Sequence, residues 1–147
     1  MEIKDIAKEA VMISENASLR EAIELMLNSY TNTLLVIDDE GTLVGEVGVS
    51  DLFDGIIPMN LDGDKALAQL QSETGFAEAV RDAAEKPVFE FMTAGFDTVR
   101  PDSTIMDVAA IAIAQGQARI PVVDHDNHPV GMISRQGLKQ ILGTYLA

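Results

Sequence analysis

Apolar residues along the chain recur in two patterns, and the same order of patterns occurs twice. In residues 19–26 they return every three or four positions, which is the spacing of an amphipathic helix. Residues 34–37 then form a short apolar run bounded by polar turn residues, which is typical of a buried strand. A second strand at residues 43–47 and a closing helix over residues 52–56 follow. The pattern predicts helix, strand, strand and helix.

The second copy of this helix, strand, strand and helix order makes the sequence an internal repeat. Residues 18–56 align without a gap on residues 104–142, at an offset of 86 positions. Five aligned pairs are identical: Val36 and Val122, Asp38 and Asp124, Val44 and Val130, Gly45 and Gly131, Leu52 and Leu138. Each copy has a further strand candidate upstream, at residues 10–13 and 96–100. The repeating unit is therefore β-α-β-β-α.

Both copies carry the same signal for the start of their first helix. Ser18 precedes Glu21 by three positions, and Thr104 precedes Asp107 by three. In such a capping box the hydroxyl accepts a hydrogen bond from a first-turn N–H, and the acid accepts one from the capping residue. We therefore expect helices to begin directly after Ser18 and Thr104.

The size of the repeat bears on the fold class. A unit of about 55 residues buries only about 60% of its unfolded surface, whereas two units together approach about 70%. We therefore expect one α/β (α+β) module in which the two copies share a core. The predicted organisation is repeat 1 at residues 1–57, a helical insert or linker at 58–87, and repeat 2 at 88–147.

The segment between the repeats has its own pattern. Pro58 and residues 60–64 predict a loop, because proline, glycine, asparagine and aspartate gather there. Two short helices are expected at residues 65–71 and 76–85, with an interruption at Thr74-Gly75. The apolar positions of these helices indicate an ordered insert packed on a surface.

Charge and composition narrow the classes of partner. The chain of 147 residues has 24 acidic and 10 basic residues, a formal net charge of -14. Binding to nucleic acid or to an anionic membrane would work against this charge. There is no cysteine, so disulfides and thiolate chemistry are excluded. No apolar run approaches the ~20 residues that cross a bilayer, and we expect a soluble cytoplasmic protein.

Motifs for catalysis are missing from the sequence. There is no Gly-x-Ser-x-Gly elbow, no phosphate loop and no His-Glu-x-x-His pair. Both histidines lie within residues 124–128, a turn that also holds Asp124 and Asp126. Such residues usually face water in a turn, so we expect neither an enzyme nor a metal site.

Three segments resemble the cystathionine-β-synthase (CBS) domain family: residues 91–104, residues 119–124 and residues 44–51. The resemblance implies a pseudo-two-fold packing of the two repeats, with two clefts between them. Members bind adenosine-containing ligands such as AMP, ADP, ATP or S-adenosylmethionine, and report metabolite status to an effector protein. Paired modules of the family commonly form homodimers, and the apolar closing helix over residues 138–146 agrees with that expectation.

The family's binding pattern is glycine, two apolar residues, serine or threonine, two variable residues, and aspartate. The first copy keeps the acid at Asp51, but Gly48 occupies the hydroxyl position. The second copy keeps the hydroxyl at Ser134, but Gly137 occupies the acid position. The resemblance implies that Asp51 accepts hydrogen bonds from the ribose hydroxyls, and that the Gly137 cleft is weak or empty.

Two arginines complete the predicted site. Arg119 matches a family position that reaches phosphate. By the same resemblance, Arg135 lies near enough in the binding pattern to help bind the phosphate. Each residue also has an interpretation without a ligand. Asp51 stabilises its helix as a first-turn carboxylate, Ser134 acts as a helix cap, and the arginines are solvated surface charges.

Two functions from different classes follow. The first is a regulatory module that binds an adenine nucleotide or another adenosyl compound in the Asp51 cleft. The alternative is a structural or protein-interaction module that has kept the fold and lost the ligand, consistent with the split motif and the negative charge. A ligand at 100 times its dissociation constant stabilises a protein by about 2.7 kcal/mol, so a panel of nucleotides distinguishes the two.

Overall fold

A computed structural model describes residues 1–56 and 73–147, and it confirms the α+β class. The predicted loop and helix between residues 58 and 71 lie outside the described residues. The chain divides into two compact units. The Asp51 unit comprises Val11–Asp38 and Val44–Ala94, and the Gly137 unit comprises Met1–Ala10, Asp39–Leu43 and Gly95–Ala147.

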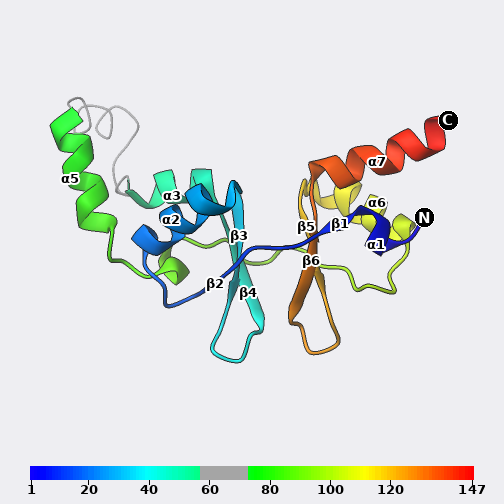
Figure 1. The fold of residues 1–147 in the computed structure, drawn as a ribbon, viewed down its shortest axis with the longest axis horizontal. Helices are drawn as coiled ribbons and strands as arrows, with labels where there is room; N and C mark the ends of the chain where they lie inside the picture. Colours follow the sequence, from blue (N-terminus) through cyan, green and yellow to red (C-terminus); the bar gives the residue numbers. More distant parts are fainter. Residues whose placement is uncertain (57–72) are drawn as a thin grey trace. The chain divides into compact units, whose positions relative to one another are not determined.

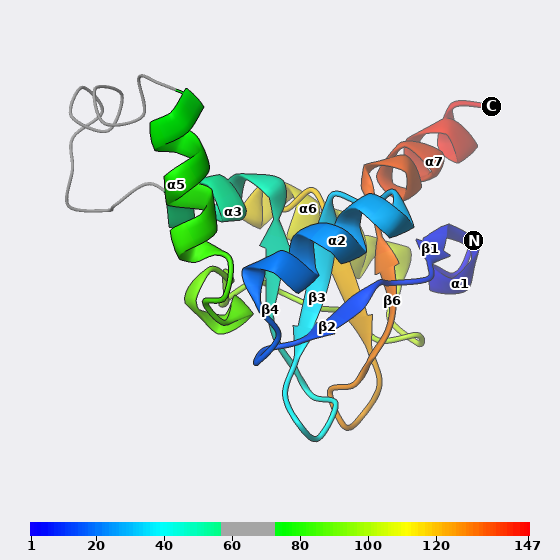
Figure 2. The same ribbon diagram turned by 60° about the vertical axis from the view of Figure 1, so that its left-hand side comes forward.

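The Asp51 unit is built on a three-stranded sheet in the order β2-β3-β4, and Figure 2 shows helix α2 lying across it. Its strands are β2 (Met12–Ser14), β3 (Thr33–Ile37) and β4 (Leu43–Gly48). β2 runs parallel to β3, with Ile13 opposite Val36. The helices of the unit are α2 (Leu19–Ser29), α3 (Val49–Ile56), α5 (Glu73–Ala83) and the short 3-10 helix η1 (Val88–Glu90).

The Gly137 unit has a second three-stranded sheet in the order β1-β6-β5 (Figure 1). Its strands are β1 (Ala7–Lys8), β5 (Ile120–Val123) and β6 (Pro129–Ile133). Both pairings are antiparallel, with Lys8 opposite Met132 and Val122 opposite Gly131. The helices are α1 (Ile3–Ile6), α6 (Ile105–Gln115) and α7 (Arg135–Leu146).

The predicted starts of the first helices are confirmed. The Ser18 hydroxyl accepts from the Glu21 N–H at 3.1 Å, and the Thr104 hydroxyl accepts from the Asp107 N–H at 3.1 Å. At Thr104 the box is complete, because the Asp107 carboxylate also accepts from the Thr104 N–H at 2.9 Å. These bonds satisfy N–H groups that have no partner inside the helix.

The segment before the first strand of each repeat belongs to the unit that contains the sheet of the other repeat. Residues 1–10 belong to the unit that holds the second repeat's sheet, and residues 88–94 belong to the unit that holds the first. Ile3 and Ile6 lie in the core with Ile133 and Ile141, while Val88 and Phe91 lie in the core with Leu34 and Leu52. Many of the buried apolar side chains of the described residues fall into two clusters, one in each unit, and the expected core shared by the two copies stays a prediction.

Two local expectations need correction. The strand expected at residues 96–100 is reduced to one parallel bridge, between Val99 and Val122. The interruption expected at Thr74-Gly75 is absent, because α5 begins at Glu73 and runs through both residues; one glycine costs a helix only about 1 kcal/mol. The helix and strand of residues 3–8 were not expected.

Candidate functional site

Asp51 lies in the first turn of α3, which follows β4 without a loop. Its Oδ2 accepts a hydrogen bond from the Gly48 backbone N–H at 2.7 Å. This is the acid half of a capping box, and the hydroxyl half is missing because Gly48 has no side chain. The positive end of the helix dipole also favours a carboxylate here. The interpretation of Asp51 as a first-turn carboxylate is therefore correct as far as its position goes.

The other carboxylate oxygen is held from a distant part of the chain. The Thr93 hydroxyl donates to Asp51 Oδ1 at 3.1 Å. The backbone of Thr93 is fixed against β4, because its N–H donates to the Glu46 carbonyl at 2.8 Å and its carbonyl accepts from the Glu46 N–H at 2.9 Å. Three segments thus meet at one acid. We call Gly48, Asp51 and Thr93 the Asp51 corner.

The Asp51 corner retains capacity to bind. A carboxylate offers about four acceptor positions, and the bonds from Gly48 and Thr93 use one on each oxygen. Asp51 is only partly buried, so the remaining positions can meet a ligand. A half-buried carboxylate held by two donors suits two adjacent hydroxyl groups, such as those of a ribose, because both can donate to it.

The glycine at position 48 is not required by packing. A Cβ added there would lie 3.6 Å from Asp51 Oδ2 and 3.8 Å from the Asn32 carbonyl oxygen, which are ordinary contacts. Its φ also lies outside the left-handed region. A serine therefore fits at this position without a backbone change.

The equivalent corner of the Gly137 unit is different. Ser134 precedes α7 in the N-cap position, but its hydroxyl makes no capping hydrogen bond. Ser134 therefore occupies the predicted N-cap position, but its hydroxyl does not form the predicted capping hydrogen bond. A Cβ added at Gly137 would lie 2.6 Å from the Ile6 carbonyl oxygen. Because that oxygen belongs to the backbone of α1, no acid fits at residue 137 without displacing α1.

The remaining predicted residues fall in a different unit from Asp51. Gly48 and Asp51 belong to one unit, whereas Arg119, Ser134 and Arg135 belong to the other. Arg119 is half-buried just before β5, and Arg135 is exposed at the first position of α7. In the described part of the chain neither guanidinium has a hydrogen bond or an ion pair. Their contribution to a site at Asp51 stays a prediction.

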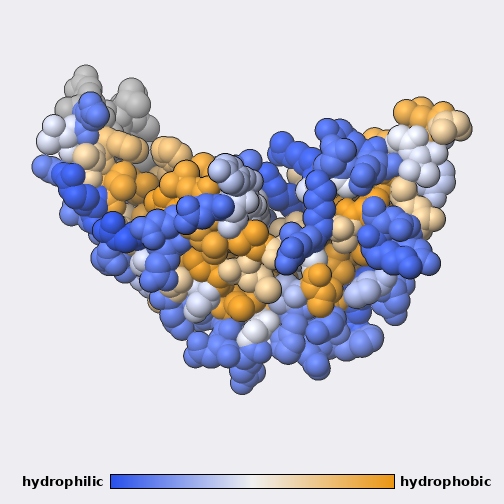
Figure 3. Space-filling model, in the orientation of Figure 1, coloured by the Kyte–Doolittle hydropathy of each residue, from blue (hydrophilic) through white to orange (hydrophobic). Residues whose placement is uncertain are grey.

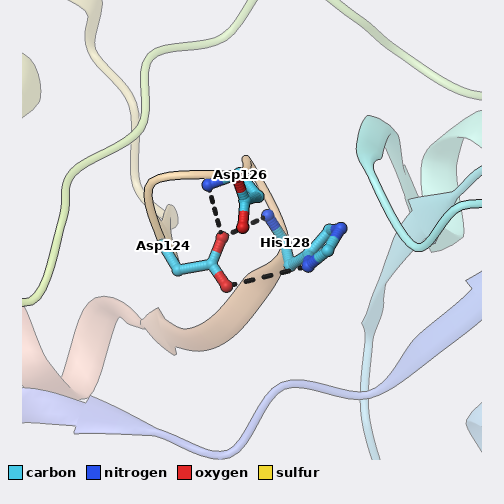
Figure 4. Close-up of side chains that lie close together, drawn as sticks. All are labelled: Asp124, Asp126 and His128. Carbon is cyan, nitrogen blue, oxygen red and sulfur yellow. Dashed lines mark hydrogen bonds and ion pairs between the residues drawn. The ribbon is translucent and has the colours of Figure 1, made fainter.

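The turn between β5 and β6 gathers Asp124, Asp126 and His128, whose ligand-type atoms lie within 4.8 Å of one another (Figure 4). The carboxylate of Asp124 already accepts from the backbone N–H groups of Asp126 and His128, both at 2.9 Å. The bond from His128 is the main cause that lowers the pKa of Asp124 below its ordinary value. These bonds shape the turn, and the expectation that it holds no metal stays a prediction.

An apolar groove in the Asp51 unit lies between α2, α3 and α5, and Figure 3 shows the apolar side chains around it. Its cavity volume is about 610 Å³. The rings of Phe53 and Phe76 pack across it with centroids 6.5 Å apart. Residues that line it include Ile23, Met26, Leu52 and Val80. None of the described residues that line the groove is charged.

The comparisons with known proteins support the resemblance. The family model described as CBS domain matches residues 3–57 and 88–143. The protein MJ1426 of Methanocaldococcus jannaschii is 29% identical over 153 residues, covering 97% of this chain and 91% of its own. The carnitine transport ATP-binding protein OpuCA of Listeria monocytogenes is 29% identical over 132 residues, covering 90% of this chain. This chain spans only 27% of that transporter subunit.

Solved structures give the same fold. A CBS domain-containing protein from Kribbella flavida superposes with a TM-score of 0.79 at 23% identity, covering 97% of this chain and 99% of its own. The CBS domain pair of MJ0100, in complex with 5′-methylthioadenosine and S-adenosylmethionine, has a TM-score of 0.68 at 25% identity, covering 99% and 98%. CBSX2 of Arabidopsis thaliana, in complex with AMP, has a TM-score of 0.71 at 23% identity, covering 99% and 98%. Within residues 1–56 and 73–147, no helix has the length and apolar character to cross a membrane.

Proposed function

The chain belongs to the CBS domain family, and we propose that it is a regulatory module that binds an adenosyl compound through Asp51. The observation that carries the proposal is the carboxylate of Asp51, held by Gly48 and Thr93 with acceptor positions remaining on both oxygens. Candidate ligands are AMP, ADP, ATP and S-adenosylmethionine. The proposed role is to sense the ligand for an effector protein and not to catalyse a reaction.

The ligands of related structures have one part in common. MJ0100 was solved with 5′-methylthioadenosine and S-adenosylmethionine, and CBSX2 was solved with AMP. All three molecules carry an adenosine with two adjacent ribose hydroxyls, whereas only AMP carries a phosphate. An acid that binds these hydroxyls therefore serves every member of the set. Arg119 and Arg135 are the proposed phosphate contacts, since a guanidinium binds phosphate through paired hydrogen bonds.

The test is to titrate AMP, ATP, S-adenosylmethionine and 5′-methylthioadenosine by calorimetry into the wild-type chain and into Asp51→Asn. We expect at least one of them to bind the wild type, and Asp51→Asn to weaken it by about tenfold or more, because charge-assisted hydrogen bonds to the ribose are lost. Asp107→Asn is the matched control. Asp107 also accepts the N–H of its helix cap, but it does not occupy the motif position, so its loss should leave affinity unchanged.

The outcomes separate the two functions. If none of the four compounds binds the wild type, the interaction module without a ligand is the better description. The glycines at positions 48 and 137, each of which removes half of the motif, favour that second function. If both aspartate variants weaken binding equally, Asp51 acts only through the stability of its helix.

The proposed homodimer has a separate basis. Leu142, Tyr145 and Leu146 of α7 are exposed by 68%, 71% and 85%. Apolar side chains gathered on one helix end favour a protein partner. Light scattering gives the mass of the particle in solution, and a mass of one chain contradicts the dimer.

A further inference from the structure

The first repeat lacks a hydroxyl at the position where its motif calls for one, and the structure supplies a hydroxyl from another part of the chain. We propose that Thr93 is the positioning residue of the adenosyl site, which orients Asp51 in place of the side chain missing at Gly48. The inference rests on the proposed function and adds to it a residue that the motif does not contain.

Thr93 acts on the acid and not on the helix. At Thr104 the hydroxyl accepts from a backbone N–H of its own helix. The Thr93 hydroxyl instead donates to Asp51 Oδ1, while the Gly48 N–H donates to Oδ2. One donor on each oxygen fixes the plane of the carboxylate. A carboxylate already oriented for a ribose loses less conformational freedom when the ligand binds.

The position of Thr93 is itself well determined. Its backbone forms both hydrogen bonds of an antiparallel bridge with Glu46, two residues before β4 ends at Gly48. The hydroxyl is therefore carried by a fixed backbone, although the Thr93 side chain is exposed. A side chain anchored in this way can orient its neighbour without being part of the core.

The equivalent corner of the Gly137 unit lacks the counterparts of both Asp51 and Thr93. By strand pairing, Lys8 stands opposite Met132 as Thr93 stands opposite Glu46. Lysine has no hydroxyl, and Gly137 has no carboxylate. The acid and the hydroxyl that orients it are thus present together in one unit and absent together in the other, as expected if they act as a pair.

The test compares Thr93→Val with the conservative variant Thr93→Ser, by calorimetric titration with AMP and 5′-methylthioadenosine. We expect Thr93→Val to weaken binding by about five- to tenfold, because the acid loses one of its two donors. Thr93→Ser, which keeps the hydroxyl, should bind like the wild type. Adding Gly48→Ser to Thr93→Val should restore part of the affinity, since serine fits at that position.

A second measurement needs no ligand. The Gly48 N–H donates to Asp51, so its amide resonance in a ¹⁵N-¹H spectrum reports the orientation of the carboxylate. We expect this resonance to move in Thr93→Val and to stay in place in Thr93→Ser. If Thr93→Val changes neither the Gly48 resonance nor the affinity, while Asp51→Asn weakens binding, this inference is overturned and the proposed function stands. Failure of the wild type to bind either probe overturns the proposed function and this inference with it.

Discussion

The two closing helices, α3 and α7, approach their neighbouring segments at different points. In α7 the close approach is in the first turn, where a Cβ at Gly137 would lie 2.6 Å from the backbone oxygen of Ile6. In α3 it is near the end of the helix, where a Cβ at Gly55 would overlap the ring of Phe91. The first turn of α3 carries Asp51. The close approach at Gly137 is a packing reason why that position of α7 carries no acid.

Gly137→Asp is the strongest test of this comparison. We expect it to destabilise the protein by about 3 kcal/mol, because the backbone of α1 must move away from α7. Gly143→Asp on the same helix is the matched control, since a Cβ there meets nothing within 4 Å. Urea unfolding measures both. Equal stability of Gly137→Asp and the wild type would contradict the packing explanation.

The ends of α2 and α6 offer a smaller test. Both helices end in a left-handed residue, at Tyr30 with a φ of 52° and at Gly116 with a φ of 60°. This conformation costs a residue with a side chain about 1–2 kcal/mol. We expect Tyr30→Gly to stabilise the protein by about 1 kcal/mol and Gly116→Ala to destabilise it by about as much. Thermal unfolding checks both, and a loss of stability in Tyr30→Gly would show that Tyr30 gains more from contacts than it loses in strain.

The smallest effect concerns pH. The N–H groups of His128 and Asp126, with the two nearby histidines, hold the pKa of Asp124 below its ordinary value of 3.8. A depressed carboxyl pKa stabilises the fold above that value, and the contribution is lost as the pH falls through the folded-state pKa. We therefore expect the unfolding free energy of Asp124→Asn to depend less on pH below about 4 than that of the wild type. Identical acid unfolding curves would contradict this.

The sequence predicted what local chemistry determines. The capping residues Ser18 and Thr104 and the buried strands over residues 34–37 and 120–123 depend on neighbours a few positions away, and all were expected. Asp51 was expected in a first helical turn for the same reason. The bond from Thr93 joins residues 42 positions apart, and no periodicity reports such a contact.

The segments that belong to the other repeat's unit were missed for a related reason. The spacing of Ile3 and Ile6 fits a helical turn, but four residues are too few to predict one. Their partners lie in β6 and α7, far along the sequence. The expected strand at residues 96–100 fails because only Val99 finds a partner in β5. Pairing between distant segments depends on the assembled core and not on the segment's own pattern.

The pairing of β1 with β6 also has a consequence for synthesis. Lys8 leaves the ribosome long before Met132, its partner in the sheet. At a translation rate of about 5–20 residues per second, the interval is about 6–25 s. During that time β1 has no β6 strand to pair with. A strand made late therefore completes the structure of a segment made early.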